Sequence, residues 1–144
     1  MKKKTVTVLC WVAVALCMAV IFYFSSQPAT LSQSVSDRFA FLLQLPFGSF
    51  IVRKSAHFLE FAGLSVLVFN ALHSTFGKFR PFTAFAVTAV YGITDEIHQI
   101  FVDGRACRFF DWLVDCSGAA AALIFVCLII FLSRKYERRN PNDE

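Results

Sequence analysis

Acidic and imidazole side chains gather in two short stretches of an otherwise apolar chain. Asp95 and Glu96 are adjacent, and His98 follows two residues later. The second stretch holds His57 and Glu60, three residues apart. Neighbouring carboxylates at low dielectric resist double ionisation, so either one of them keeps a proton or cations such as Arg53 and Arg105 neutralise the pair. A retained proton could be exchanged with a substrate. The five acidic and imidazole residues are the predicted catalytic groups.

Basic and further polar side chains flank the two stretches. Arginine presents a planar fork of donors to phosphate or carboxylate groups, and lysine offers a compact charge. The predicted substrate-binding residues are Arg53, Lys54, Gln99, Arg105, Asp111 and Asp115. The acids and imidazoles could also ligate a divalent metal, but no spacing such as H-E-x-x-H occurs, so the sequence predicts no metal and identifies no cofactor.

Helical spacing gathers these groups on three stripes, because residues three and four apart share a helix face. In chain order the stripes are Arg53-His57-Glu60-Leu64, Thr88-Tyr91-Asp95-Gln99 and Asp111-Asp115-Gly118-Ala122. Gly118 and Ala122 are small and four residues apart, which suits close helix contact in a bilayer. The third stripe is therefore predicted to face protein and not lipid.

The composition places these stripes in a membrane protein. The chain has 144 residues, of which 57% are hydrophobic and 18 are phenylalanine, and its mean hydropathy is +0.60. A water-soluble fold of this length would leave roughly 30% of its unfolded surface in water, too much for so apolar a chain. Four apolar segments each approach the roughly 20 residues needed to cross a bilayer: 5–24, 57–76, 82–101 and 114–132. We predict an all-α integral membrane protein with four transmembrane helices, a single domain over 1–144 and a tail at 133–144.

The distribution of lysine and arginine predicts the orientation. With the N-terminus inside, nine of the 14 lysines and arginines lie on the inner side and five on the outer side, as the positive-inside rule requires. Both termini are then cytoplasmic, and the polar stripes form a cluster at the extracytoplasmic end. A cleaved signal peptide is less favoured, because the first apolar run exceeds the about 7–15 residues of an h-region and no small-x-small site follows it.

The segment 25–56 joins the first two predicted spans. It begins rich in serine and glutamine, and residues 39–45 are then apolar except for Gln44. Pro46 and Gly48 interrupt this run, which is too short to span a bilayer. We predict a re-entrant or interfacial piece here.

Several short motifs occur in a fixed order along the chain. They are F-S-S-Q-P at 24–28, R-K-S-A-H-F-L-E at 53–60, Y-G-I-T-D-E-I-H-Q-I-F-V at 91–102, Gly104-Arg105, and Asp111 with Asp115 and Gly118. Together they resemble the VanZ-like family of bacterial multi-pass membrane proteins, from about residue 8 to residue 132. Two departures are Asp103, where the family often has proline, and Phe61, where it often has tyrosine.

The resemblance implies a cell-envelope role in the bacterial cytoplasmic membrane, because the family is named for an accessory protein linked to teicoplanin resistance. The first hypothesis is an enzyme that acts at the outer leaflet on a lipid-linked or cell-wall-related anionic substrate, with membrane lipids as partners and no nucleic acid. The alternative is a non-catalytic binding or accessory protein whose polar cluster is an ion-pair lock or ligand site. A small transporter is less favoured, since the polar groups are confined to one leaflet. No nucleophile motif such as G-x-S-x-G occurs, so whether the chain is an enzyme stays open.

Overall fold

Five α-helices make up the chain in a computed structural model that describes residues 2–44 and 48–139. In order they are α1 (Lys2–Ser25), α2 (Ala29–Leu42), α3 (Gly48–Phe76), α4 (Pro81–Gln99) and α5 (Phe109–Arg139). No strand occurs within the described ranges. The prediction of an all-α chain is confirmed.

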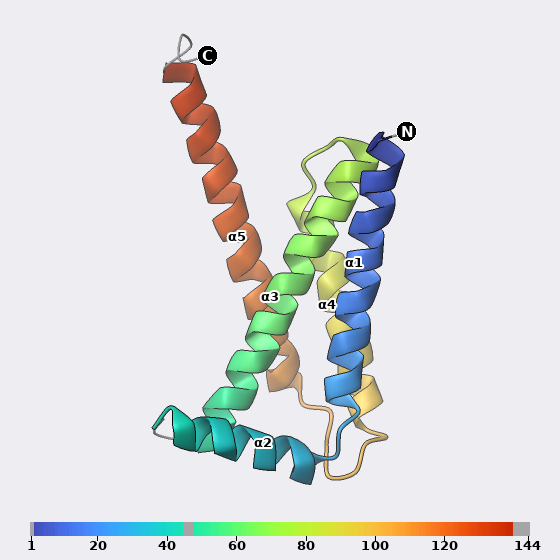
Figure 1. The fold of residues 1–144 in the computed structure, drawn as a ribbon, viewed down its shortest axis with the longest axis vertical. Helices are drawn as coiled ribbons and strands as arrows, with labels where there is room; N and C mark the ends of the chain where they lie inside the picture. The colour runs from blue at the N-terminus through green and yellow to red at the C-terminus, as the bar shows by residue number, and fades with distance from the viewer. Residues whose placement is uncertain (1, 45–47, 140–144) are drawn as a thin grey trace.

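Helices α1, α3, α4 and α5 run along the long axis of the molecule, and α2 lies across one end (Figure 1). We call this end the α2 end. The start of α1 and the end of α5 lie at the opposite end of the molecule (Figure 1). Helix α3 packs against each of the other four helices, and α5 diverges from α3 toward its C-terminus (Figure 1).

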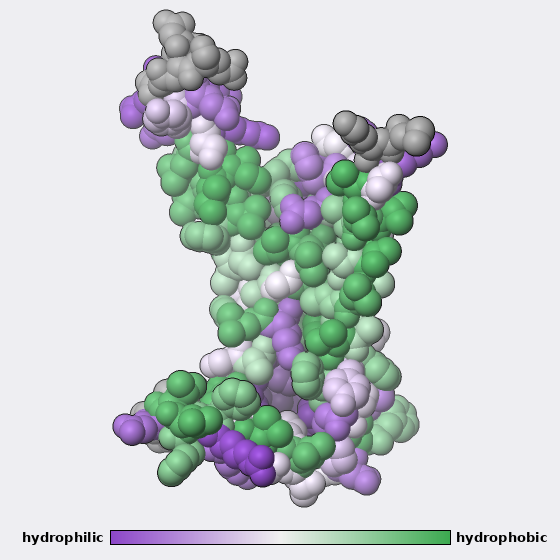
Figure 2. Space-filling model, viewed as in Figure 1, coloured by the Kyte–Doolittle hydropathy of each residue, from purple (hydrophilic) through white to green (hydrophobic). Residues whose placement is uncertain are grey.

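Three of the described helices are long and apolar enough to cross a membrane: α1 from Lys3 to Ser25, α3 and α5. Apolar residues cover the middle of the molecule, with hydrophilic residues concentrated toward both ends (Figure 2). Helix α4 also runs between the two ends (Figure 1), but it is not among the three. Its last two turns carry Asp95, Glu96, His98 and Gln99, which lower its hydropathy.

Several boundaries differ from the predicted ones. Helix α3 begins at Gly48 and not at residue 57, and α5 begins at Phe109 and ends at Arg139 instead of covering 114–132. The length of an apolar run measures only what lipid can cover, so it misses helical turns that continue beyond the lipid. Arg53 and Lys54 therefore lie on a helix and not in a loop.

Helix α2 lies in a segment for which only residues 39–45 were predicted to be interfacial. Its buried residues are Ser36 and Ala40, which are small, so no stripe of large apolar residues marks the helix in the sequence. Leu45 and Pro46 of that prediction, and residues 140–144 of the predicted tail, lie outside the described residues.

The helices meet around an apolar core that includes Ile21 of α1, Phe61 and Leu64 of α3, and Leu123 of α5. Gly118 is a point of close approach between α5 and α3. A Cβ atom there would lie 2.1 Å from the carbonyl oxygen of Phe58. The prediction that Gly118 faces another helix is confirmed, and this contact fixes the relative position of α3 and α5 beside His57 and Asp115.

Candidate functional site

A cavity of about 690 Å³ lies at the α2 end, bounded by α1, α2, α3, the α4–α5 loop and the start of α5. Figure 2 shows a recess with hydrophilic residues between α2 and the helices next to it. Seven of the eleven predicted site residues line the cavity: Arg53, Lys54, His57, Glu60, Gln99, Arg105 and Asp111.

The walls of the cavity differ in chemistry. One is basic, because α3 and the α4–α5 loop contribute four lysine and arginine side chains. The facing wall is formed by α2, which contributes the apolar residues Leu31, Val35 and Phe39 beside the uncharged polar residues Ser32, Gln33 and Ser36. The three apolar residues are four apart and therefore share one face of α2. The cavity is thus amphipathic.

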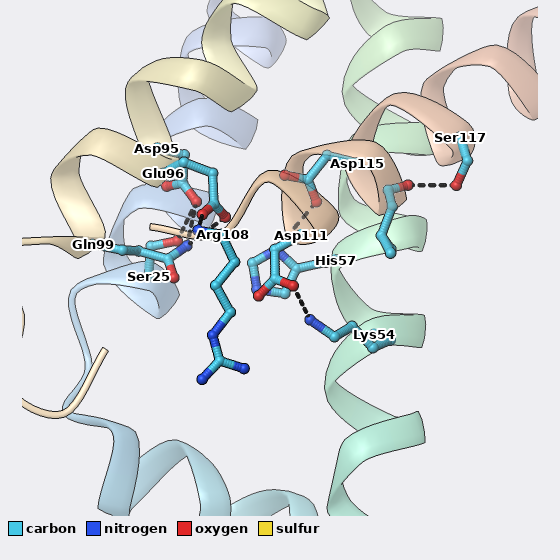
Figure 3. Close-up of polar contacts among 11 residues, drawn as sticks. Ser25, Lys54, His57, Asp95, Glu96, Gln99, Arg108, Asp111, Asp115 and Ser117 are labelled. Atoms are coloured by element: carbon cyan, nitrogen blue, oxygen red, sulfur yellow. Dashed lines mark hydrogen bonds and ion pairs between the residues drawn. The ribbon is translucent and has the colours of Figure 1, made fainter. Parts of the chain in front are cut away.

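Asp95 and Glu96 lie behind the cavity and do not line it. The Asp95 side chain is 2% exposed and accepts hydrogen bonds from Ser25 Oγ at 2.7 Å and Gln99 Nε2 at 3.0 Å. Glu96 Oε2 accepts the backbone N–H of Arg108 at 2.8 Å. These contacts tie the end of α4 to α1 and to the loop before α5 (Figure 3).

His57 and Asp115 form a second layer between α3 and α5. Asp115 is 1% exposed, and its Oδ1 lies 3.3 Å from His57 Nδ1. The distance fits an ion pair, but these atoms do not meet hydrogen-bond geometry, and neither has another hydrogen-bond partner among the described residues. His57 also lines the cavity. Asp115 therefore stands behind an imidazole that a ligand can reach (Figure 3).

The four basic side chains of the cavity are not equivalent. Lys54 pairs with Asp111. Arg105 donates to backbone carbonyl oxygens at the end of α1 and in the α1–α2 connection. The side chains of Arg53 and Arg108 make no hydrogen bond or ion pair with any of the residues 2–44 and 48–139. The Arg108 guanidinium points away from Glu96 toward α2 (Figure 3).

Arg105 joins the α4–α5 loop to the end of α1. Its Nε donates to Gln27 O at 2.9 Å and its Nη2 to Phe24 O at 3.0 Å. Burial lowers the pKa of the Arg105 guanidinium from its ordinary value, and the nearby negative charge of Asp95 opposes this shift. The loop is also held to α2, because the Ala29 N–H donates to Asp103 O at 3.1 Å.

We expect Arg105→Lys to lower the thermal stability of the protein. An ammonium group cannot reproduce the fork that contacts two carbonyl oxygens at once, and the loss of one such bond costs about 1–2 kcal/mol. The measurement is the midpoint of thermal unfolding in detergent, with Arg134→Lys on the exposed end of α5 as the control. Equal midpoints for the two variants would show that the Arg105 bonds contribute nothing to stability.

His98 contacts the end of α1. Its Nε2 lies 3.0 Å from Ser26 Oγ, and its ring stacks on Phe22 with 4.2 Å between centroids. It lies beside α1 and does not line the cavity. Its predicted catalytic role stays a prediction. Within the described ranges, no three His, Cys, Asp or Glu side chains are grouped as they would be in a metal site.

Two residues of the site, Arg108 and Ser25, were not among the predicted site residues. Arg108 lies in the same loop as Arg105, three residues later, so the clustering of basic residues there was the available signal. Ser25, the partner of Asp95, belongs to the F-S-S-Q-P motif. That motif had no assigned role, because a serine at the end of an apolar run does not indicate its partner.

Comparison with known proteins identifies the family. Residues 10–132 match the family described as VanZ/LLP1. Neither the curated proteins nor the solved structures yield a match. The matched range includes α2 to α4, most of α1 and the larger part of α5, and so every residue that lines the cavity. This helical multi-pass membrane protein therefore belongs to the VanZ/LLP1 family.

Proposed function

We propose that the cavity binds an anionic, lipid-linked or cell-wall-related molecule at the outer leaflet of the bacterial cytoplasmic membrane. The observation that carries the proposal is the pair of arginines, Arg53 and Arg108, whose side chains line the cavity without a partner among the described residues. Both guanidinium groups can be reached from the cavity and have no counter-charge among the described residues. An anionic ligand would supply the counter-charge and form charge-assisted hydrogen bonds.

The proposal includes a topology of four membrane crossings, in which α4 crosses the membrane in addition to α1, α3 and α5. Helix α4 runs antiparallel to α3 and α5, and the start of α1 and the end of α5 lie at one end of the molecule (Figure 1), as an even number of crossings requires. The excess of lysine and arginine at that end supports a cytoplasmic position for it. The α2 end is then extracytoplasmic.

Reporter fusions test this topology. We expect alkaline phosphatase to be active when fused after Asp103 in the α4–α5 loop, and green fluorescent protein to fluoresce when fused after Arg139. A phosphatase fusion after Lys78, at the opposite end, is the matched control and should be inactive. Phosphatase activity from a fusion after Arg139 would contradict the proposed orientation.

If the protein is an enzyme, His57 and Glu60 are the groups that we assign to proton transfer. Both line the cavity, so both can reach a bound molecule. Asp115 would act as a positioning residue, because its carboxylate lies against Nδ1 and leaves Nε2 to exchange a proton. Asp95 and Glu96 would hold the ends of helices around the cavity without contacting the ligand.

A non-catalytic site with an ion-pair lock is the second candidate, and one observation favours it. Lys54, Asp95 and Glu96 all bind groups of the protein itself. The lock accounts for these residues but not for the unpaired side chains of Arg53 and Arg108. A transport path is disfavoured, because the core beyond the cavity is apolar.

The two candidates share one test in the native host. We expect an Arg53→Gln/Arg108→Gln strain to show the same change in lipid and cell-wall-precursor profile as a deletion strain, with the protein at normal abundance. Arg38→Gln is the control, since Arg38 is exposed on α2 and does not line the cavity. A wild-type profile in the double variant, beside an altered one in the deletion, would show that the two arginines are not needed. Through the link of the family to teicoplanin, we propose that susceptibility to this antibiotic changes in the same strains.

A further inference from the structure

We infer that the ligand is a phosphate-bearing amphiphile, with its phosphate at Arg53 and Arg108 and its apolar part against the Leu31, Val35 and Phe39 face of α2. The inference rests on the proposed function and names its substrate class. It decides between a lipid-linked molecule and a hydrophilic wall fragment, which the proposed function leaves open.

The choice of phosphate follows from which cations are available. Lys54 is neutralised by Asp111, and Arg105 is held in place by the bonds that its Nε and Nη2 donate to carbonyl oxygens. The two groups that remain are both guanidinium groups. A guanidinium binds two oxygens of one acid in parallel, and a phosphate has enough oxygens to serve two such forks at once. A carboxylate has only two oxygens and would satisfy one fork.

The choice of an amphiphile follows from the opposite wall. Leu31, Val35 and Phe39 line the cavity and are each about half exposed. A hydrophilic fragment would leave these side chains in water, whereas an acyl or prenyl chain would cover them and gain from the burial. Phe50 and Val52 of α3 extend the apolar lining beyond α2.

The two walls are held in a fixed relation to each other. The first residue of α2, Ala29, donates its N–H to Asp103 in the α4–α5 loop that carries Arg108. Gly104 of this loop has φ +72°, and a Cβ atom there would lie 3.1 Å from Ala29 Cβ. The apolar face of α2 is therefore attached to the basic loop, so one molecule can contact both walls.

A free phosphate ester would meet the same arginines but gain nothing from α2. The test therefore compares three probes on the purified full-length protein in an uncharged detergent. They are dioctanoyl phosphatidic acid, glycerol 3-phosphate, which lacks the chains, and dioctanoylglycerol, which lacks the phosphate. Affinity is measured by isothermal titration calorimetry, and every variant is first checked by size-exclusion chromatography and thermal unfolding.

We expect phosphatidic acid to bind at least about tenfold more tightly than either of the other probes. Arg53→Gln/Arg108→Gln should weaken its binding by about tenfold or more, and Phe39→Ser should weaken it without affecting glycerol 3-phosphate. Arg38→Gln and Phe41→Ser, on α2 but outside this cavity, are the controls and should leave binding unchanged. If the double variant fails to fold, Arg108→Gln alone replaces it, because Arg108 is exposed.

The possible outcomes separate the inference from the proposed function. In one outcome, glycerol 3-phosphate binds as tightly as phosphatidic acid, with binding that is lost in the arginine variant. The inference of an amphiphilic ligand is then wrong, and the proposed anion site is kept. If dioctanoylglycerol binds as tightly as phosphatidic acid, or if the arginine variants bind phosphatidic acid like the wild type, both the inferred phosphate group and the proposed anion site are wrong. The absence of binding for all three probes would also overturn both.

Discussion

Gly118→Ala should leave little folded protein in the membrane. A Cβ atom at Gly118 would lie 2.1 Å from the carbonyl oxygen and 2.9 Å from the carbonyl carbon of Phe58. Both are backbone atoms of α3, so no side-chain rotation can relieve the clash, and α3 and α5 must separate. Overpacking of a rigid contact costs about 3 kcal/mol or more, a large share of the stability of a typical protein.

Gly63→Ala is the matched control for this prediction. Gly63 lies on α3, and a Cβ atom there has no neighbour within 4 Å among the described residues. Alanine in place of glycine inside a helix should raise stability by about 0.5–1 kcal/mol. Fluorescence-detected size exclusion and thermal unfolding measure both variants. A monodisperse Gly118→Ala protein with the wild-type midpoint would show that α3 and α5 do not meet at this point.

The second large effect is expected at His57 and Asp115. His57→Gln removes the only basic side chain within ion-pair distance of the buried Asp115 among the described residues. Breaking such a pair by removing one partner costs about 3–5 kcal/mol, because the remaining charge has no compensation. We expect the lower end of this range, since His57 is partly exposed to the cavity. Thermal and denaturant unfolding measure the loss.

The double variant His57→Gln/Asp115→Asn separates stability from function. It removes both charges at nearly constant volume, so most of the stability lost in the single variant should return. If His57 acts on a ligand, the lipid and wall-precursor profile should stay like that of the deletion strain. A double variant that regains both stability and the wild-type profile would support the ion-pair lock.

The helical membrane fold could be predicted because the apolar runs are long and uninterrupted. The position of α2 could not, because its buried residues are Ser36 and Ala40, and a small-residue contact leaves no periodic signal. The first turns of α3 were missed for a different reason. Arg53 and Lys54 interrupt the apolar pattern, although the helix continues through them.

The candidate site, too, could be predicted from the sequence only in part. Helical periodicity placed Arg53, His57 and Glu60 on one stripe, and the structure places all three on the cavity wall. Periodicity alone could not show what Asp95 faces. Its partner Ser25 is 70 residues away in the sequence. Only the packing of α1 against α4 therefore reveals that this carboxylate accepts a hydrogen bond from another helix and is not free to bind a ligand.

The most direct measurement of the central claim is native mass spectrometry of the protein released from membranes of its own host. We expect the wild-type protein to retain a phosphorus-containing lipid-linked molecule, and the Arg53→Gln/Arg108→Gln variant to lose it while Arg38→Gln keeps it. The account would be contradicted if wild-type protein and double variant retain the same molecules in equal amounts, or if only uncharged lipids remain bound.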